Sequence, residues 1–139
     1  MSERTSESWL IENGRLICPK QNLDRVGRLL IHGGVIAAID PTDEAIPANA
    51  RRVDAQDWIV APGLVDLATE LGEPGREEDE SIETGTMAAL AGGFTSIACA
   101  ANTDPPIDTA TAVEFVRQKA ARADRCRVYV IGCVSKGRQ

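Results

Sequence analysis

The chain has 139 residues, of which 43% are hydrophobic and 26% are charged, a composition typical of a globular protein with one core. Its formal net charge of -6 and its lack of a run rich in lysine and arginine argue against nucleic acid or an anionic membrane surface as a partner. No apolar run approaches the roughly 18 residues of a membrane-spanning helix, and the N-terminus lacks the pattern of a signal peptide, so we expect a soluble, cytoplasmic protein.

The first part of the chain, residues 1–58, is expected to form a small β unit. The dipeptide Asn13-Gly14 lies between apolar residues of the segment 9–17 and is typical of a type I′ turn, so a hairpin is predicted there. A second hairpin, a loop and two further short strands are expected over residues 28–39, 41–49 and 51–60.

The second part, residues 59–139, is predicted to alternate strands and helices. It opens on the segment Ile59–Gly75, in which two apolar runs are separated by Pro62-Gly63, and this pattern favours a buried strand with polar residues at its end. The elements expected after it are a helix from Ile82 to the Gly92-Gly93 stop, a strand over 94–101, a helix with capping-box spacing at Thr111–Glu114, and a strand over 127–133. Such alternation implies parallel strands joined by helical crossovers.

The end of the first of these strands carries the polar residues Asp66 and Glu70. The carboxyl edge of a parallel sheet is where α/β enzymes present their functional groups, so these residues are candidates for a site. The alternative, of equal weight on these residues alone, is that Asp66 caps a turn and Glu70 is solvated. The charged run 76–80 is interpreted as a solvated helix entry rather than a metal-binding cluster, because acidic side chains stabilise a helix N-terminus.

The cysteines and the single histidine are not expected to form a site. His32 stands beside Gly33-Gly34 in a predicted turn and is interpreted as a surface residue. The four cysteines show no CxxC spacing, so we expect reduced and mostly buried thiols at Cys18, Cys99, Cys126 and Cys133.

The segment from residue 62 to residue 75 resembles the start of the barrel in the dihydroorotase family of the amidohydrolase superfamily. In that family the first strand reads Pro-Gly-hydrophobic-hydrophobic-Asp-x-His-x-His and is followed by Leu-Arg-Glu-Pro-Gly. The residues that fit this pattern here are Pro62, Gly63, Leu64, Val65, Asp66, Leu71, Glu73, Pro74 and Gly75. The resemblance extends over nearly the whole chain, from about Trp9 to Lys136.

The residues to which the resemblance gives chemical roles are changed in this chain. The two zinc-binding histidines of the family correspond to Ala68 and Glu70, and the arginine that binds the substrate corresponds to Gly72. A methyl group cannot donate an electron pair to zinc, whose ligands are nitrogen, sulfur or carboxylate oxygen, so no metal or other cofactor is expected here although the family uses zinc.

One substrate-binding residue of the family is retained after the second barrel strand. The family reads Pro-Asn-Thr-x-Pro there, and Asn102, Thr103 and Pro105 match, with Ala101 in place of the first proline. The resemblance therefore gives Asn102 the role of binding a substrate carboxylate. The alternative, of equal weight, is that Asn102 favours a turn before proline and binds nothing.

The resemblance implies an α/β fold in which the β unit of residues 1–58, part of a composite β domain, precedes the first three β/α units of a (β/α)8 barrel. A complete barrel needs roughly 250 residues, so the barrel is incomplete in this chain. We therefore expect an oligomer or a part of a longer chain.

Two functions follow from the resemblance. The first is a dihydroorotase-like protein of pyrimidine biosynthesis without hydrolase activity of its own, because degenerate members of the family lack the zinc histidines and assemble with aspartate carbamoyltransferase. The alternative is the N-terminal fragment of an active, zinc-dependent dihydroorotase or cyclic amidohydrolase that acts on C–N bonds of cyclic amides.

Overall fold

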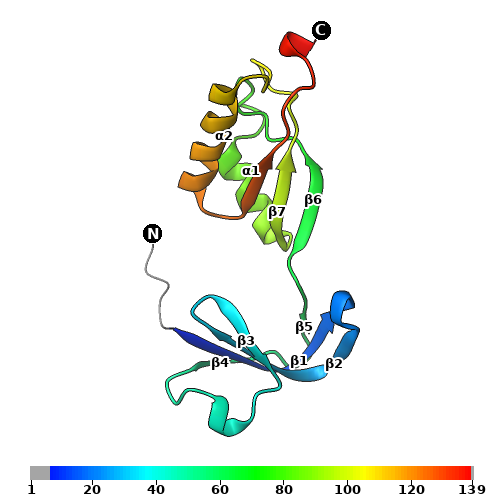
Figure 1. Ribbon diagram of the computed structural model, residues 1–139, viewed down its shortest axis with the longest axis vertical. Coiled ribbons are helices and arrows are strands. Elements are labelled where there is room, and N and C mark those ends of the chain that lie inside the picture. Colours follow the sequence, from blue (N-terminus) through cyan, green and yellow to red (C-terminus); the bar gives the residue numbers. More distant parts are fainter. Residues whose placement is uncertain (1–6, 139) are drawn as a thin grey trace. The chain divides into compact units, whose positions relative to one another are not determined.

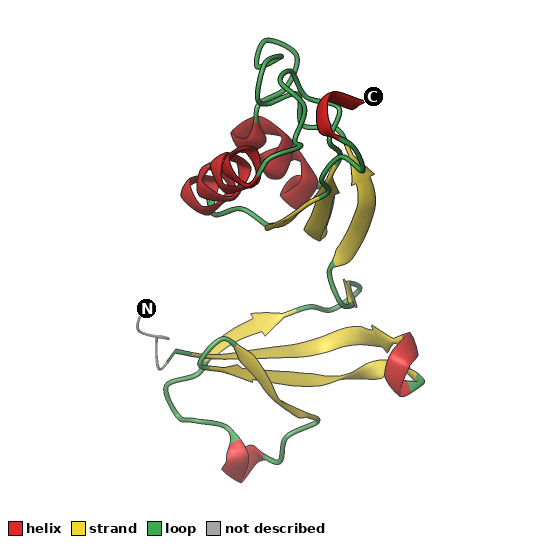
Figure 2. Cartoon of the chain, turned by 45° about the horizontal axis from the view of Figure 1, so that its top comes forward, coloured by secondary structure: helices red, strands yellow, loops and turns green. Residues whose placement is uncertain are grey.

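A computed structural model describes residues 7–138, and the chain divides into two compact units between Pro62 and Gly63 (Figure 1). Figure 2 shows that strands predominate in the first unit, whereas the second combines strands with helices. Each unit is described by itself below.

The first unit is built on one sheet in which β1 is the central strand. β1 pairs antiparallel with β2 and parallel with both β4 and β5, and β3 continues the sheet beyond β2. The strands are β1 (Ser8–Cys18), β2 (Leu23–His32), β3 (Val35–Ile39), β4 (Arg51–Asp54) and β5 (Ile59–Val60), with short 3-10 helices at Pro19–Gln21 and Asp43–Ala45. The buried hydrophobic residues of this unit are Leu10, Leu16, Leu30 and Ala55.

The predicted hairpin turn at Asn13-Gly14 is wrong, because β1 runs through it as one strand. Asn13 has the expected positive φ of 65°, but the chain uses it for an irregularity in the pairing with β2 between Ile11 and Gly14. Neighbouring backbone hydrogen bonds explain the difference. Ala55 N donates to the carbonyl oxygen of Glu12 at 2.8 Å and Arg15 N donates to that of Trp58 at 2.9 Å, so the segment 55–58 supports the strand on either side of the bulge.

The second predicted hairpin is confirmed. β2 and β3 pair antiparallel around Gly33 and Gly34, whose φ values of 58° and 77° suit a residue without a side chain. The two strands expected within residues 51–60 also form, as β4 and β5, and each pairs with β1.

The second unit is a parallel three-stranded sheet with both helices on one side of it (Figures 1 and 2). This confirms the predicted α/β class and the alternation of strands and helices. Its elements are β6 (Leu64–Thr69), α1 (Ile82–Ala91), β7 (Phe94–Cys99), α2 (Ala110–Ala123), β8 (Arg127–Val130) and a short 3-10 helix at Lys136–Arg138. The buried core comprises Leu71, Ile82, Ile97, Cys99, Ile107, Val116 and Ala120.

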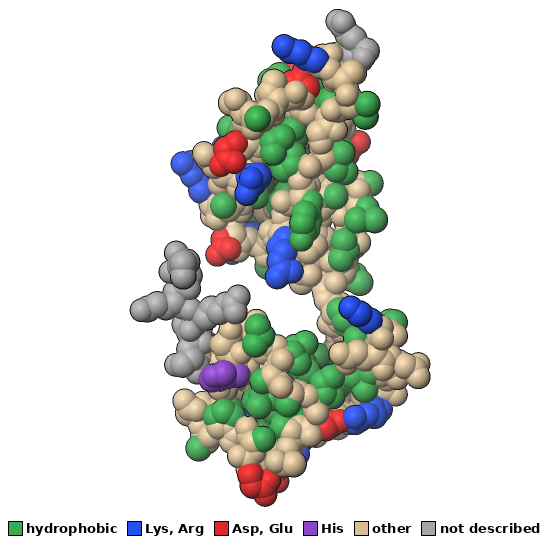
Figure 3. Space-filling model, viewed as in Figure 1, with side chains coloured by type: hydrophobic (Ala, Val, Ile, Leu, Met, Phe, Trp, Pro, Cys, Tyr) green, Lys and Arg blue, Asp and Glu red, His purple; other side chains and the backbone are tan. Residues whose placement is uncertain are grey.

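The expectation of one buried strand across Ile59–Gly75 is wrong. Ile59 and Val60 form β5 of the first unit, whereas β6 begins the second unit at Leu64. Hydrophobic side chains of β6 are exposed, with Val65 at 59% and Leu67 at 74%, and Figure 3 shows hydrophobic side chains at the surface of this unit. β6 is an edge strand, paired only with β7 within the described residues, and both helices lie on one side of the sheet.

The helix ends differ in part from the predicted ones. α1 begins after Ser81, whose hydroxyl accepts a hydrogen bond from Thr84 N at 3.2 Å in a capping box. The capping box predicted for α2 at Thr111–Glu114 is wrong, because Thr109 caps the helix by accepting from Ala112 N at 3.2 Å. Leu90 on α1 is 45% exposed.

The cysteines of the described chain are all free, but only Cys99 is buried, so the expectation of mostly buried thiols is wrong. Burial raises the pKa of the Cys99 thiol, which keeps it protonated at neutral pH. His32 is exposed, and its Nδ1 lies 2.8 Å from the hydroxyl oxygen of Ser8.

Among residues 7–138 no helix has both the length and the apolar character needed to cross a membrane.

A cluster of opposite charges holds the β2–β3 side of the first unit. Arg28 N donates to Asp40 Oδ1 at 2.8 Å, Arg25 forms an ion pair with the same carboxylate, and Arg28 Nη1 donates to Asp43 Oδ1 at 2.7 Å. The backbone hydrogen bond from Arg28, followed by the contact with Arg25, lowers the pKa of Asp40 below its usual value.

This shift predicts a loss of stability in acid. A carboxyl group whose pKa is lower in the folded state stabilises the protein above its unfolded pKa of about 3.9, and the contribution disappears as the pH falls through the folded pKa. We expect Asp40→Asn to be less stable than the parent at pH 7 and to lose less on going to pH 3, in urea unfolding followed by circular dichroism. Asp57→Asn, a change at an exposed aspartate of this unit, is the control, and an unchanged pH profile in Asp40→Asn would contradict the assignment.

Candidate functional site

The carboxyl ends of β6, β7 and β8 meet at one edge of the sheet because the three strands are parallel. The segments that follow them, residues 70–81, 100–109 and 131–135, therefore gather at this edge, which lies at the arrowheads of β6 and β7 in Figure 1. All the residues given a role in the sequence analysis lie on β6 or in these segments.

The two positions that correspond to zinc ligands lie at the end of β6. Ala68 is exposed and its backbone N–H donates to Asp66 Oδ1 at 2.9 Å, a local hydrogen bond within β6. Glu70 is exposed. The exposure of Glu70 and the local hydrogen bond of Asp66 need no bound ligand to explain them.

The donors present at this edge do not fit a zinc site. Ala68 offers no lone pair, and zinc in proteins takes at least three side-chain ligands. Within residues 7–138 no group of three or more His, Cys, Asp or Glu side chains is placed to hold a metal ion.

The position that corresponds to the substrate arginine is closed by backbone. Gly72 is buried with a φ of 59°, and a Cβ added there would lie 2.7 Å from the carbonyl oxygen of Glu80 and 2.8 Å from that of Arg76. Real Cβ atoms do not approach backbone oxygens so closely, so any side chain at this position requires the loop to move. The loop in this conformation therefore has no space for an arginine side chain at position 72.

The loops after β6 and β7 are joined at Gly75. Asp104 N donates to the carbonyl oxygen of Pro74 at 3.0 Å, and a Cβ at Gly75, whose φ is 100°, would overlap the carbonyl oxygen of Asp104. Both oxygens of the Glu77 carboxylate accept from Gly75 N at 3.0 Å, which lowers the pKa of Glu77. The loop after β8 is also joined to the loop after β7 by a backbone hydrogen bond, in which Cys133 N donates to the carbonyl oxygen of Ile107 at 2.8 Å.

Asn102, the candidate substrate-binding residue, follows β7 at this edge and is half-buried. Its side-chain oxygen Oδ1 is buried and has no hydrogen-bond partner within the described residues. The guanidinium of Arg76 donates from Nη2 to the backbone oxygen of Asn102 at 3.4 Å. The structure thus places an asparagine beside a cation, a neighbour that the sequence analysis did not identify.

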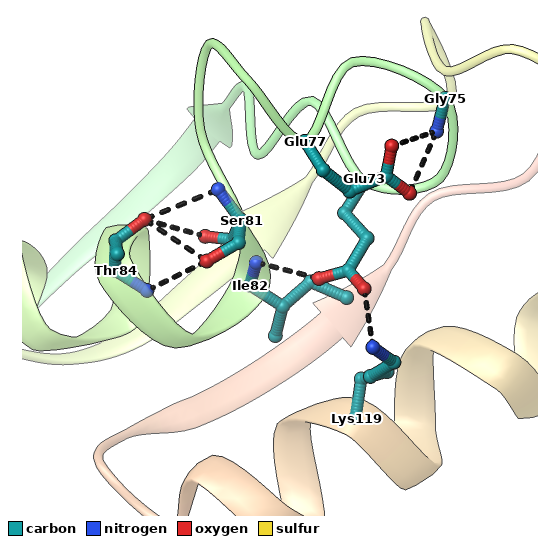
Figure 4. A network of polar contacts seen from close by, with 7 residues as sticks. All are labelled: Glu73, Gly75, Glu77, Ser81, Ile82, Thr84 and Lys119. Carbon is teal, nitrogen blue, oxygen red and sulfur yellow. Dashed lines mark hydrogen bonds and ion pairs between the residues drawn. The ribbon is translucent and has the colours of Figure 1, made fainter.

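A buried carboxylate that the sequence analysis gave no role, Glu73, joins three elements (Figure 4). Its Oε2 accepts from Ile82 N in the first turn of α1 at 3.0 Å, and its Oε1 lies 2.7 Å from Nζ of Lys119 on α2. The glutamate is only 4% exposed. The sequence singles out Glu73 as part of the family motif but gives no sign of its contact with Lys119, which is distant along the chain.

Comparisons with solved structures agree with this architecture. The chain matches an L-hydantoinase (dihydropyrimidinase) from Arthrobacter aurescens with a TM-score of 0.75 at 24% identity, over 88% of this chain and 27% of that one. A D-hydantoinase matches with a TM-score of 0.74 at 26% identity, over 94% of this chain and 29% of that one. The fold is therefore that of the N-terminal region of an amidohydrolase TIM-type barrel, which these three strands do not complete.

Sequence comparisons define the family within that class. The dihydro-orotase-like family model matches residues 57–136. A relative from Rhodopirellula baltica is 53% identical over 132 residues, which are 95% of this chain and 29% of the relative. The dihydroorotase of Syntrophus aciditrophicus is 44% identical over 127 residues, 91% of this chain and 30% of that protein.

The chain belongs to the dihydro-orotase-like family, as its motifs indicated. It spans less than a third of the length of the curated relatives it matches, 29% and 30% for these two.

The packing of Gly75 against Asp104 predicts that a side chain at position 75 destabilises the protein more than a side chain at an unpacked glycine with a positive φ. Gly75→Ala should lower the free energy of unfolding by about 3 kcal/mol, because it combines a strained φ with overlap of a backbone oxygen. Gly137→Ala is a matched control with a φ of 65° and no atom within 4 Å of its Cβ, and it should cost only about 1 kcal/mol. Thermal unfolding of the two variants checks this, and equal losses would contradict it.

The contacts of Glu73 predict that removing the charge of its carboxylate destabilises the folded protein. Glu73→Gln should lower the free energy of unfolding by about 2 kcal/mol, since an amide keeps an acceptor for Ile82 N but leaves Lys119 without its counter-charge. Glu114→Gln, an exposed residue on α2 with an ion pair to Arg117, should change it by less than about 0.5 kcal/mol. Urea unfolding measures both values, and a loss in Glu73→Gln no larger than in the control would refute the structural role of Glu73.

Proposed function

We propose that this protein is a dihydroorotase-like protein of pyrimidine biosynthesis that has no hydrolase activity of its own and acts as a structural partner of aspartate carbamoyltransferase. Membership of the dihydro-orotase-like family and relatives named dihydroorotase support the pyrimidine context. The residues Ala68, Glu70 and Gly72 support the loss of hydrolysis. In the family's reaction a bound metal activates water and polarises the amide carbonyl, and these residues do not supply the side chains that hold the metal and the substrate.

The observation that carries this proposal is the closed backbone around Gly72. A missing side chain alone could be compensated by a neighbouring residue, but here the carbonyl oxygens of Glu80 and Arg76 occupy the space that a side chain at position 72 needs. The loop is therefore organised around a glycine. That organisation keeps the scaffold intact and leaves no room for the family's arginine.

A second function is favoured by the length of the chain. Because this chain spans only 29–30% of its curated relatives, it can also be the N-terminal part of a zinc-dependent dihydroorotase or cyclic amidohydrolase whose remaining ligands lie elsewhere in the protein. Zinc content separates the two functions.

The full native polypeptide, purified at neutral pH, should contain no stoichiometric zinc by elemental analysis and should not hydrolyse dihydroorotate. The physical reason is that Ala68 offers no donor and a single carboxylate at Glu70 is a weak ligand. About two zinc ions per chain together with turnover would refute the proposal and establish the alternative. The double variant Ala68→His with Glu70→His is the companion test, and a rise in its zinc content would show that the other ligands are present.

The structural role has its own test. The full native polypeptide and aspartate carbamoyltransferase from the same organism should co-elute in size-exclusion chromatography at micromolar concentration. Separate elution, with both proteins folded, would refute the partnership and leave the loss of hydrolysis untouched.

A further inference from the structure

A cavity of about 380 Å³ lies in the second unit between the loop after β6, the first turn of α1 and the end of α2. Its volume is within the range of roughly 300–1,000 Å³ that is usual for small-molecule sites. Among the described residues, Ala68, Gly72 and Asn102 do not line it, so the cavity is separate from the positions that correspond to the family's functional residues. The charged side chains that line it are Glu73, Glu77, Glu83, Lys119 and Arg122.

The charges on the loop side of this cavity are held in place. The Glu73 carboxylate is only 4% exposed and binds both Ile82 N and Nζ of Lys119 (Figure 4). This contact uses one of the three N–H donors of the ammonium group, and the Lys119 side chain is 43% exposed, so its other donors are available to a ligand. The Glu77 carboxylate is also held, because both of its oxygens accept from Gly75 N at 3.0 Å.

The two remaining charges line the cavity from different helices and do not pair. Glu83 lies in the first turn of α1 and Arg122 in the last turn of α2, and both are exposed. The ion pairs of this unit among residues 7–138 are Arg117–Glu114 and Lys119–Glu73, so Glu83 and Arg122 pair neither with each other nor with another residue there. A carboxylate and a guanidinium that line one cavity without meeting are complementary to a molecule that carries both charges.

We infer that this cavity binds a small zwitterion, an α-amino acid with a short side chain. Its ammonium group binds the carboxylate of Glu83, and its carboxylate binds the guanidinium of Arg122 and the available donors of Lys119. The bound molecule thereby connects the first turn of α1 to the end of α2. The inference does not depend on the proposed function, because binding in this cavity requires neither a metal nor its absence.

The test is an NMR titration of the full native polypeptide with three probes at pH 7 and low salt. Glycine carries both charges, N-acetylglycine lacks the ammonium group, and glycinamide lacks the carboxylate. We expect saturable binding of glycine with a shift of the Arg122 Nε–H signal, and binding about fivefold weaker or less for each of the other two probes. Added salt should weaken glycine binding, because the charges that hold it are partly exposed.

Variants of the two unpaired residues give the matching result. Glu83→Gln and Arg122→Gln should each weaken glycine binding about tenfold, because each removes one of the two charges that the ligand matches. Glu114→Gln and Arg117→Gln are the matched controls, since both change exposed residues of α2 that do not line this cavity, and they should leave binding unchanged. The spectra of all four variants report whether they are folded.

The outcomes separate a specific site from general electrostatic attraction. Saturable binding of glycine that depends on both Glu83 and Arg122 would support the inference. No saturable binding, equal binding of N-acetylglycine or glycinamide, or undiminished binding in a folded Glu83→Gln or Arg122→Gln variant would overturn it. Equal losses in the control variants would also overturn it, because binding would then follow the charge of α2 as a whole and not the cavity.

Discussion

The arrangement of the second unit depends on one buried carboxylate, that of Glu73. One of its oxygens binds the N-terminus of α1 through Ile82 N, where a negative charge also complements the helix dipole, and the other binds Lys119 of α2. The loop after β6 is thereby attached to both helices at a single residue. Gly72 and Gly75 lie on either side of this residue, and their backbone packs against the carbonyl oxygens of neighbouring loop residues.

The fold was predictable from the sequence wherever the signal was local. The turn at Gly33-Gly34 and the alternation of strands and helices after residue 63 needed only dihedral preferences and hydrophobic periodicity. The prediction failed where distant residues decide, as at Asn13, whose left-handed backbone serves a bulge because residues 55–58 bind the chain on either side of it. The burial of β6 was overestimated for the same reason, since the strand is at a sheet edge among the described residues.

The sequence indicates which positions correspond to the family's functional residues, but it does not indicate their geometry. The sequence alone shows that Ala68 cannot bind a metal. It does not show that backbone oxygens surround Gly72, that Lys119 reaches Glu73, or that Arg76 lies beside Asn102, because each of these contacts joins segments separated along the chain or depends on a single φ angle.

The conformation of Gly72 also has an evolutionary consequence. Replacing a glycine codon by an arginine codon is one mutational step, but at this position the new side chain meets the carbonyl oxygens of Glu80 and Arg76. An arginine side chain at this position requires a second change that moves the loop, because Gly72→Arg alone carries a stability cost. The conformation of the backbone therefore makes a direct change from glycine to arginine at position 72 unfavourable.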